Sequence, residues 1–110
     1  MALIAVEDGT SEHTGSTVVG PVAGTLTVGS DSFFTIEGKL AMVEDGTMEI
    51  PSHQYQLLPP LFHSHSYNPD TLANNYFYIE GKRVILVGDS FSGDATEVKN
   101  AGSNSIFEVA

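Results

Sequence analysis

The sequence GSDSFFTIEGK, at residues 29–39, has two related stretches later in the same chain. It recurs as LANNYFYIEGK at residues 72–82 and, in shortened form, as GSNSIFEV at residues 102–109. Each copy contains small or polar residues, then two aromatic or branched residues, one variable position, and a final Ile or Val. Aromatic and β-branched residues in this arrangement favour β-strands. Three copies of one strand pattern predict a protein built from three repeated units.

A second repeated pattern precedes each of these strands. It reads AVEDGT at residues 5–10, MVEDGT at residues 42–47 and LVGDS at residues 86–90. Apolar residues that run into Asp followed by Gly or Ser are typical of a strand that ends in a turn, where the carboxylate accepts local backbone N–H bonds. The first two strand copies also end in Glu-Gly, at residues 37–38 and 80–81. Glycine supplies the positive φ that a two-residue hairpin turn requires, and the type of turn stays open.

Three segments connect the acidic turns to the following strands, and we predict that they are loops of different character. Residues 9–27 are rich in Gly and Val, residues 46–71 contain four of the five prolines and three of the four histidines, and residues 90–101 are short and polar. The second loop contains the apolar stretch LLPPLF at residues 57–62. We expect this stretch to cover the side of the molecule or to fold over the core. Insertion into a membrane and contact with a partner protein are its alternative roles.

The repeats predict the architecture of the whole chain. A three-stranded unit of this size cannot bury both of its faces alone, so the three units must pack on one another around a pseudo-threefold axis. The sequence lacks the density of Ala, Leu, Glu and Lys that helices prefer. We therefore predict an all-β fold, a small conical domain of three β repeats that occupies residues 1–110. A monomer with internal threefold symmetry also matches the end of a homotrimer.

Composition excludes several classes of partner. The 110 residues include 4 Lys and Arg against 14 Asp and Glu, which gives a formal net charge of −10. Four basic residues spread from Lys39 to Lys99 form no patch for nucleic acid or for an anionic membrane surface. The chain has no Cys, so a metal site must use His, carboxylates and water. The N-terminal stretch MALIAV has no basic region and is too short for a signal peptide, so we expect synthesis in the cytoplasm.

The repeats resemble those of the PAAR-repeat proteins. In that family the strand reads Gly-Ser-x-x-Val-Phe-Val-Asn-Gly-Lys, followed by Val-Gly-Asp, with an early Gly-Asp-x-Thr-Ser-His. This chain matches with the three strand copies, with VGD at residues 87–89, and with EDGTSEH at residues 7–13, which has one extra residue before the His. It departs from the family in lacking a Pro-Ala-Ala-Arg run, and in having Glu-Asp for Gly-Asp and Glu-Gly for Asn-Gly. The resemblance covers nearly the whole chain.

The resemblance implies a metal near the apex, because family members hold a zinc ion there with histidines and a cysteine. The family signature Cys-Pro-x-His corresponds to IPSH at residues 50–53, which keeps the Pro and the His but not the Cys. The candidate ligands are His13, His53, His63 and His65. Residues 63 and 65 lie on the same side of an extended segment, so both side chains could reach one ion. Three or four imidazoles would form a closed tetrahedral zinc site, with iron as the alternative metal. The competing interpretation is that these are ordinary polar residues of surface loops.

The resemblance also implies a function. PAAR-repeat proteins form the pointed tip of the spike in contractile phage tails, related injection particles and type VI secretion systems. We therefore expect a non-enzymatic structural protein of a virion or particle, with one monomeric tip on each trimeric β-helical spike protein, that meets the target cell envelope transiently. Apolar strand edges at the base would contact the spike. The alternative is a metal-binding β module that acts by recognition.

An enzymatic interpretation is less favoured. The pair His63 and His65 followed by Asp70 superficially resembles a cupin metal motif, but no further His follows in the chain. The sequence also has no Gly-x-Ser-x-Gly elbow, no Cys nucleophile and no Gly-rich phosphate loop followed by Lys. A His-metal enzyme remains the third alternative.

Overall fold

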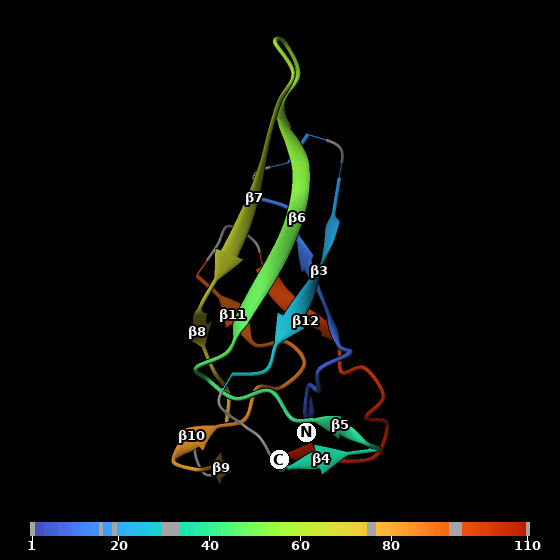
Figure 1. The fold of residues 1–110 in the computed structure, drawn as a ribbon, viewed down its shortest axis with the longest axis vertical. Coiled ribbons are helices and arrows are strands. Elements are labelled where there is room, and N and C mark those ends of the chain that lie inside the picture. The colour runs from blue at the N-terminus through green and yellow to red at the C-terminus, as the bar shows by residue number, and fades with distance from the viewer. Residues whose placement is uncertain are drawn as a thin grey trace.

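The computed structural model describes residues 2–15, 17–18, 20–29, 34–74, 77–92 and 96–109. This part of the chain is all-β and elongated, with extents of 46 × 24 × 22 Å. It tapers from a wide base, where both chain ends lie, to a single hairpin at the opposite end (Figure 1). Its strands are β1 (Ala2–Leu3), β2 (Thr10–His13), β3 (Val22–Thr27), β4 (Thr35–Ile36), β5 (Lys39–Leu40), β6 (Thr47–Gln56), β7 (Leu61–Tyr67), β8 (Pro69–Thr71), β9 (Tyr78–Ile79), β10 (Lys82–Arg83), β11 (Ser90–Phe91), β12 (Thr96–Asn100) and β13 (Glu108–Val109). The described residues contain no helix long and apolar enough to cross a membrane.

Three short antiparallel strand pairs form the base. These pairs are β4–β5, β9–β10 and β1–β13, so the third pair joins the two ends of the chain. Their registers are equivalent, because Ile36 pairs with Lys39, Ile79 with Lys82 and Val109 with Ala2. The final Ile or Val of each predicted repeat is buried in each pair. The three-repeat prediction is therefore confirmed at the level of strand register.

A closed ring of backbone hydrogen bonds joins the three units. The N–H of Ala5 donates to the carbonyl oxygen of Ile85, Ile85 donates to Met42, and Met42 donates back to Ala5, with distances of 2.8, 2.9 and 2.9 Å. Single β-bridges flank the ring, and they pair Ile4 with Leu86, Val6 with Ala41, and Val43 with Val84. Each segment thus donates to one neighbour and accepts from the other. The pseudo-threefold axis of the molecule passes through this cyclic pattern of hydrogen bonds.

The ring separates two hydrophobic cores, because side chains alternate along each of its segments. Its central residues, Ala5, Met42 and Ile85, belong to a core that continues toward the narrow end. Their neighbours in sequence belong to the core at the base, which consists of Ile4, Val6, Ile36, Ala41, Val43, Ile79, Val84, Leu86 and Val109. One strand pattern in three copies therefore supplies both cores at once.

An aromatic triangle packs with the base core. The rings of Phe34, Phe77 and Phe107 meet edge to face, with centroids 5.6, 5.7 and 6.0 Å apart. We expected one member of each aromatic or branched pair to be core and the other to lie between units or exposed. In the third pair Ile106 is exposed, while Phe107 joins the triangle. The partners Phe33 and Tyr76 lie outside the described residues.

The three predicted loops are wrong, because these segments form the strands of the large sheet. Its order is β7-β6-β3-β2-β12-β11-β8, and all its neighbours are antiparallel. Residues 9–27 supply β2 and β3, residues 46–71 supply β6, β7 and β8, and residues 90–101 supply β11 and β12. Their many Gly, Pro and His residues indicated loops, but burial alternates along β3 as it does in any half-buried strand.

The apolar stretch at residues 57–62 also lies elsewhere than expected. It does not cover the core. It forms the end of the β6–β7 hairpin, the narrow extremity of the molecule (Figure 1). Leu58 is 88% exposed there.

Both Glu-Gly turns are of type I′. Glu37 and Gly38 have φ values of 54° and 78°, and Glu80 and Gly81 have 51° and 81°. Positive φ at both central residues defines this turn, and it matches the right-handed twist of the two strands. Glutamate occupies this conformation less readily than Asn, whose short side chain tolerates the left-handed region.

The carboxylate of Asp89 holds the third acidic turn together, as the sequence predicts. It accepts hydrogen bonds from the backbone N–H groups of Leu86, at 2.8 Å, and Ala73, at 3.1 Å. Burial raises the pKa of the Asp89 carboxyl above its ordinary value of 3.8, although both backbone bonds and Arg83 act in the opposite direction. The two N–H groups would lose their acceptor if the carboxylate were removed.

Replacing Glu37 and Glu80 with Asn tests the turn assignment. We expect each substitution to raise the free energy of unfolding by about 0.5 kcal/mol, because Asn is less strained at positive φ. The control is Glu7→Asn at an exposed glutamate without positive φ, which should change stability little. Chemical denaturation measures all three variants. Equal effects at positions 7, 37 and 80 would contradict the role of the turns.

Replacing Asp89 with Ala should lower the free energy of unfolding by about 2 kcal/mol, because the substitution leaves backbone donors without an acceptor. Asp70→Ala, at an exposed position, is the control and should cost far less.

The raised pKa of Asp89 also predicts a pH dependence of stability. Between 3.8 and the raised pKa, the folded state binds the Asp89 proton more tightly than the unfolded state, so this contribution to stability falls as pH rises. Denaturation of Asp89→Ala at several pH values should lack that contribution. A pH dependence of stability equal to that of wild type would contradict the raised pKa.

Candidate metal centre

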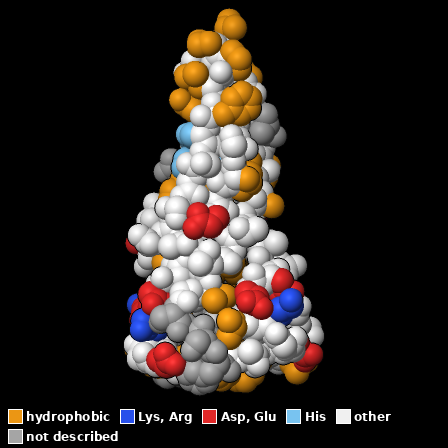
Figure 2. All heavy atoms as spheres, viewed as in Figure 1, with side chains coloured by type: hydrophobic (Ala, Val, Ile, Leu, Met, Phe, Trp, Pro, Cys, Tyr) orange, Lys and Arg blue, Asp and Glu red, His pale blue; other side chains and the backbone are white. Residues whose placement is uncertain are grey.

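The four histidines lie on strands, not in the loops where we expected them. His13 is the last residue of β2, His53 belongs to β6, and His63 and His65 belong to β7. Figure 2 shows histidine side chains below the apolar end of the hairpin. The resemblance implied a site near the apex, and the structure places the cluster between the apolar end and the body.

A β-bulge turns His53 toward the cluster. Ile50 pairs with His65 and His53 pairs with His63, so β6 spans three residues where β7 spans two. The extra residue reverses the alternation of side chains, because successive strand residues point to opposite faces. Ile50 and His53 are consequently both buried, while Pro51 and Ser52 between them are exposed. Without the bulge, the alternation that buries Met48 and Ile50 would leave position 53 on the outer face.

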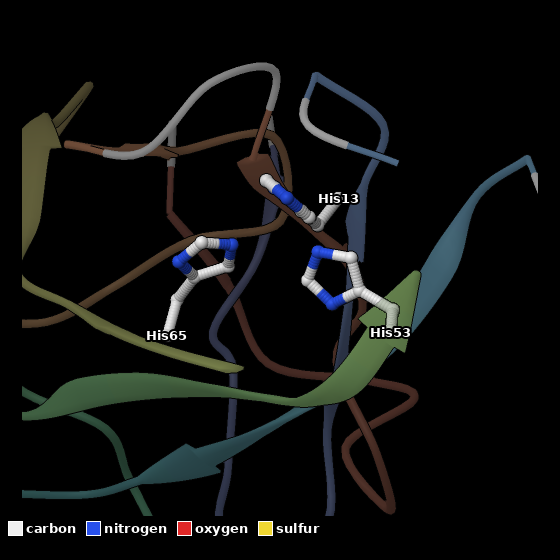
Figure 3. A group of neighbouring side chains, drawn as sticks. All are labelled: His13, His53 and His65. Carbon is white, nitrogen blue, oxygen red and sulfur yellow. The ribbon is translucent and has the colours of Figure 1, made fainter. Parts of the chain in front are cut away.

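Three of the predicted ligands converge. One ring nitrogen from each of His13, His53 and His65 lies within 4.8 Å of the other two. The ring centroids are separated by 5.0 or 5.1 Å in all three pairs, and the rings face a common space (Figure 3). His13 is fully buried and His53 is 5% exposed. Two imidazoles on one tetrahedral zinc have nitrogens about 3.4 Å apart, so modest side-chain rotations would close this triad around one ion.

The fourth histidine borders the triad. The Nε2 atoms of His63 and His53 are 2.9 Å apart, and the rings of His63 and His65 are 4.2 Å apart between centroids. Strand β7 is extended here, with His63 and His65 partly buried and Ser64 exposed between them. The prediction that the two histidines share one side is therefore confirmed.

Hydrogen bonds set the orientation of two rings. Nδ1 of His53 donates to the carbonyl oxygen of Pro51 at 2.9 Å, because a carbonyl can only accept. In a neutral ring this leaves the lone pair on Nε2, the atom that faces His63. Nδ1 of His13 lies 2.7 Å from the buried hydroxyl of Thr96, so Nε2 is the nitrogen on the other side of the ring from this contact. Partners of this kind fix the tautomer and direction of metal-binding imidazoles.

Two tyrosines support the outer rings. Tyr55 stacks on His63, with centroids 4.1 Å apart and an interplanar angle of 14°, and Tyr67 stacks on His65, at 4.8 Å and 17°. Sequence reasoning missed both tyrosines and also Thr96. The tyrosines had a signal, because each lies two residues after a histidine and so shares its strand face. Thr96 had none, since it is 83 residues away from His13.

The donor set determines what the cluster can bind. Imidazole nitrogens suit zinc, copper, iron and nickel, whereas magnesium and calcium prefer oxygen ligands. Three nearby histidines could hold one such ion. A comparison of the sequence with protein-family models found no matching family, and a comparison with curated proteins found no significant match. The chemistry of this site therefore rests on its own geometry.

Replacing His13 or His53 with Ala should abolish metal binding. We expect wild type to bind about one ion per chain and each variant to bind almost none, because a tetrahedral site loses a buried ligand. The thermal midpoint should fall with the metal, since the ion would join β2 to the β6–β7 hairpin. Plasma mass spectrometry and thermal denaturation measure the two effects.

Ser64→Ala is the matched control. Ser64 lies between His63 and His65 in the sequence, but its exposed side chain is on the other face of β7. It should keep both the metal and the thermal midpoint of wild type. Metal-free wild type, or a His53→Ala variant that retains its metal, would contradict the assignment of the site.

Proposed function

We propose that this protein is the pointed, zinc-stabilised tip of the central spike in a contractile injection machine of the PAAR-repeat kind. The machine would be a phage tail, a phage-derived particle or a type VI secretion system. The observation that carries the proposal is the cyclic hydrogen-bond ring of Ala5, Met42 and Ile85. One chain with internal threefold symmetry can contact all three subunits of a trimer through equivalent surfaces.

The shape of the molecule supports this role. The base presents three equivalent strand pairs, and the body narrows over its 46 Å length to one hairpin (Figure 2). A contracting sheath would push the trimeric spike against an envelope, and a narrow end concentrates the force on a small area. The function is mechanical, and the proposal assigns no reaction to the protein.

Zinc at the histidine cluster would strengthen the narrow half. The hydrophobic core of that half ends near Ile50, and beyond it the Val18 N–H donates to the Gln54 carbonyl of the hairpin at 3.1 Å. A zinc ion held by His13, His53 and His65, with His63 as fourth ligand, would tie the hairpin to β2. Zinc fits a structural site because it has no redox chemistry and accepts a closed tetrahedron of nitrogens. Iron is the alternative metal.

The spike contact would lie at the base. Tyr78 and Ile106 are 52% and 72% exposed, and Ile106 is next to the aromatic triangle. Exposed apolar side chains at the base suit a contact with the blunt end of a β-helical trimer. The protein itself would be a monomer in the complex.

Co-expression with a trimeric β-helical spike protein from the same source tests this function. Native mass spectrometry should find one copy of this chain for three spike chains. Ile106→Asp should weaken the complex at least about tenfold, because it buries a charge in the contact, whereas Leu58→Asp at the opposite end should not weaken it. A complex with three tips per spike trimer, or no complex at all, would overturn the proposal.

A further inference from the structure

We infer that the end of the β6–β7 hairpin is a lipid-inserting wedge that enters the apolar region of a bilayer. The inference rests on the proposed function, which brings this end of the molecule against an envelope. We call this surface the apolar tip, and its residues are Tyr55, Leu57, Leu58, Pro59, Pro60, Leu61 and Phe62.

The apolar tip is the most exposed apolar surface of the described chain. Leu57, Leu58 and Phe62 are 69%, 88% and 61% exposed, and Leu61 and Tyr55 are also exposed. Figure 2 shows hydrophobic side chains grouped at the narrow extremity. Keeping this much apolar surface in water is unfavourable, so a contiguous patch of this kind indicates an interaction.

The form of the apolar tip favours lipid over a protein partner. Successive strand residues point to opposite faces, and apolar side chains occupy positions 61 and 62 on β7 as well as 57 and 58 in the turn. The apolar tip is therefore a protrusion with apolar groups on more than one side, not a flat face or a groove. A protein would have to enclose it in a matching cavity, whereas acyl chains adapt to any shape.

Charge is confined to the other parts of the molecule. Residues 50–69 contain no Lys, Arg, Asp or Glu, although the chain as a whole has a net charge of −10. The carboxylates nearest in sequence are Glu49 and Asp70, at the foot of the hairpin. A charged side chain is costly within a bilayer, so the apolar tip, which lies beyond the histidines, meets the requirement for insertion.

Proline and glutamine residues reduce the number of backbone groups in the turn that need a partner. Pro59 and Pro60 have no N–H, so two donors that a membrane could not satisfy are missing from the turn. The side-chain amide of Gln56 donates to the Pro59 carbonyl at 3.3 Å, and that of Gln54 donates to the Gln56 carbonyl at 3.0 Å. Tyr55 lies on β6 just before the turn, and its amphipathic ring suits the level of the lipid headgroups.

A tryptophan reporter measures insertion, because the chain has no Trp of its own. We would place one by Leu58→Trp at the apolar tip and, as a matched control, by Ile106→Trp at the exposed base position. Mixing with vesicles of zwitterionic phosphatidylcholine should shift the emission of Leu58→Trp to shorter wavelength, and brominated acyl chains should quench it. Ile106→Trp should show neither effect. Leu58→Trp emission that does not change with vesicles would overturn the inference.

Charge substitution separates this inference from the proposed function. Leu58→Asp should lower vesicle partitioning at least about tenfold, since Asp is far less favourable than Leu in a membrane, and Ile106→Asp should not lower it. The effects on the spike complex are expected to be the reverse. Equal partitioning of wild type and Leu58→Asp would refute lipid insertion while leaving spike binding intact. A shift of Leu58→Trp that depends on protein concentration without vesicles would also refute it, because the apolar tip would then bind a second copy.

Discussion

The hydrogen-bond ring of Ala5, Met42 and Ile85 is the constraint on which the rest of the structure depends. It joins the three units to one another within one chain. It also decides which side chains point to the base core and which point toward the narrow end. The three strand pairs at the base and the large sheet are continuous in the chain with the segments of this ring, and the aromatic triangle packs below it. The trimeric spike that we propose as partner would meet an end that already has its symmetry.

The narrowing of the molecule leaves little room for a hydrophobic core near the hairpin, and the histidines lie where that core ends. Toward the hairpin the sheet has fewer strands, and the buried apolar residues end near Ile50. Beyond them lie the four imidazoles, and the bulge at Pro51 and Ser52 turns that of His53 inward. A metal bound by side chains needs little volume, whereas a hydrophobic core needs many packed residues. The same bulge therefore lies where the hydrophobic core ends and where the candidate metal centre begins.

The sequence predicts the base of the molecule better than its narrow half. The repeats were recognisable because Ile36, Ile79 and Val109 occupy one register in three equivalent strand pairs, and because the Glu-Gly turns have a known backbone requirement. The sequence predicts a loop where the β6–β7 hairpin lies, since prolines interrupt this segment and the bulge breaks the alternation that identifies a strand. The candidate ligands were predicted by residue type, but their convergence depends on that bulge. The orienting contact of Thr96 depends on tertiary pairing, which no local pattern encodes.

The most direct test of this account is X-ray diffraction from metal-loaded crystals at the zinc absorption edge. The account predicts one anomalous peak for each chain, bonded to Nε2 of His13 and His53 and to ring nitrogens of His63 and His65, at about 2.0 Å. The same crystals would show whether the Ala5, Met42 and Ile85 segments form the ring below the peak. A peak elsewhere, or a zinc bound by fewer than three of these histidines, would contradict the central claim that a threefold body carries a metal-stabilised hairpin.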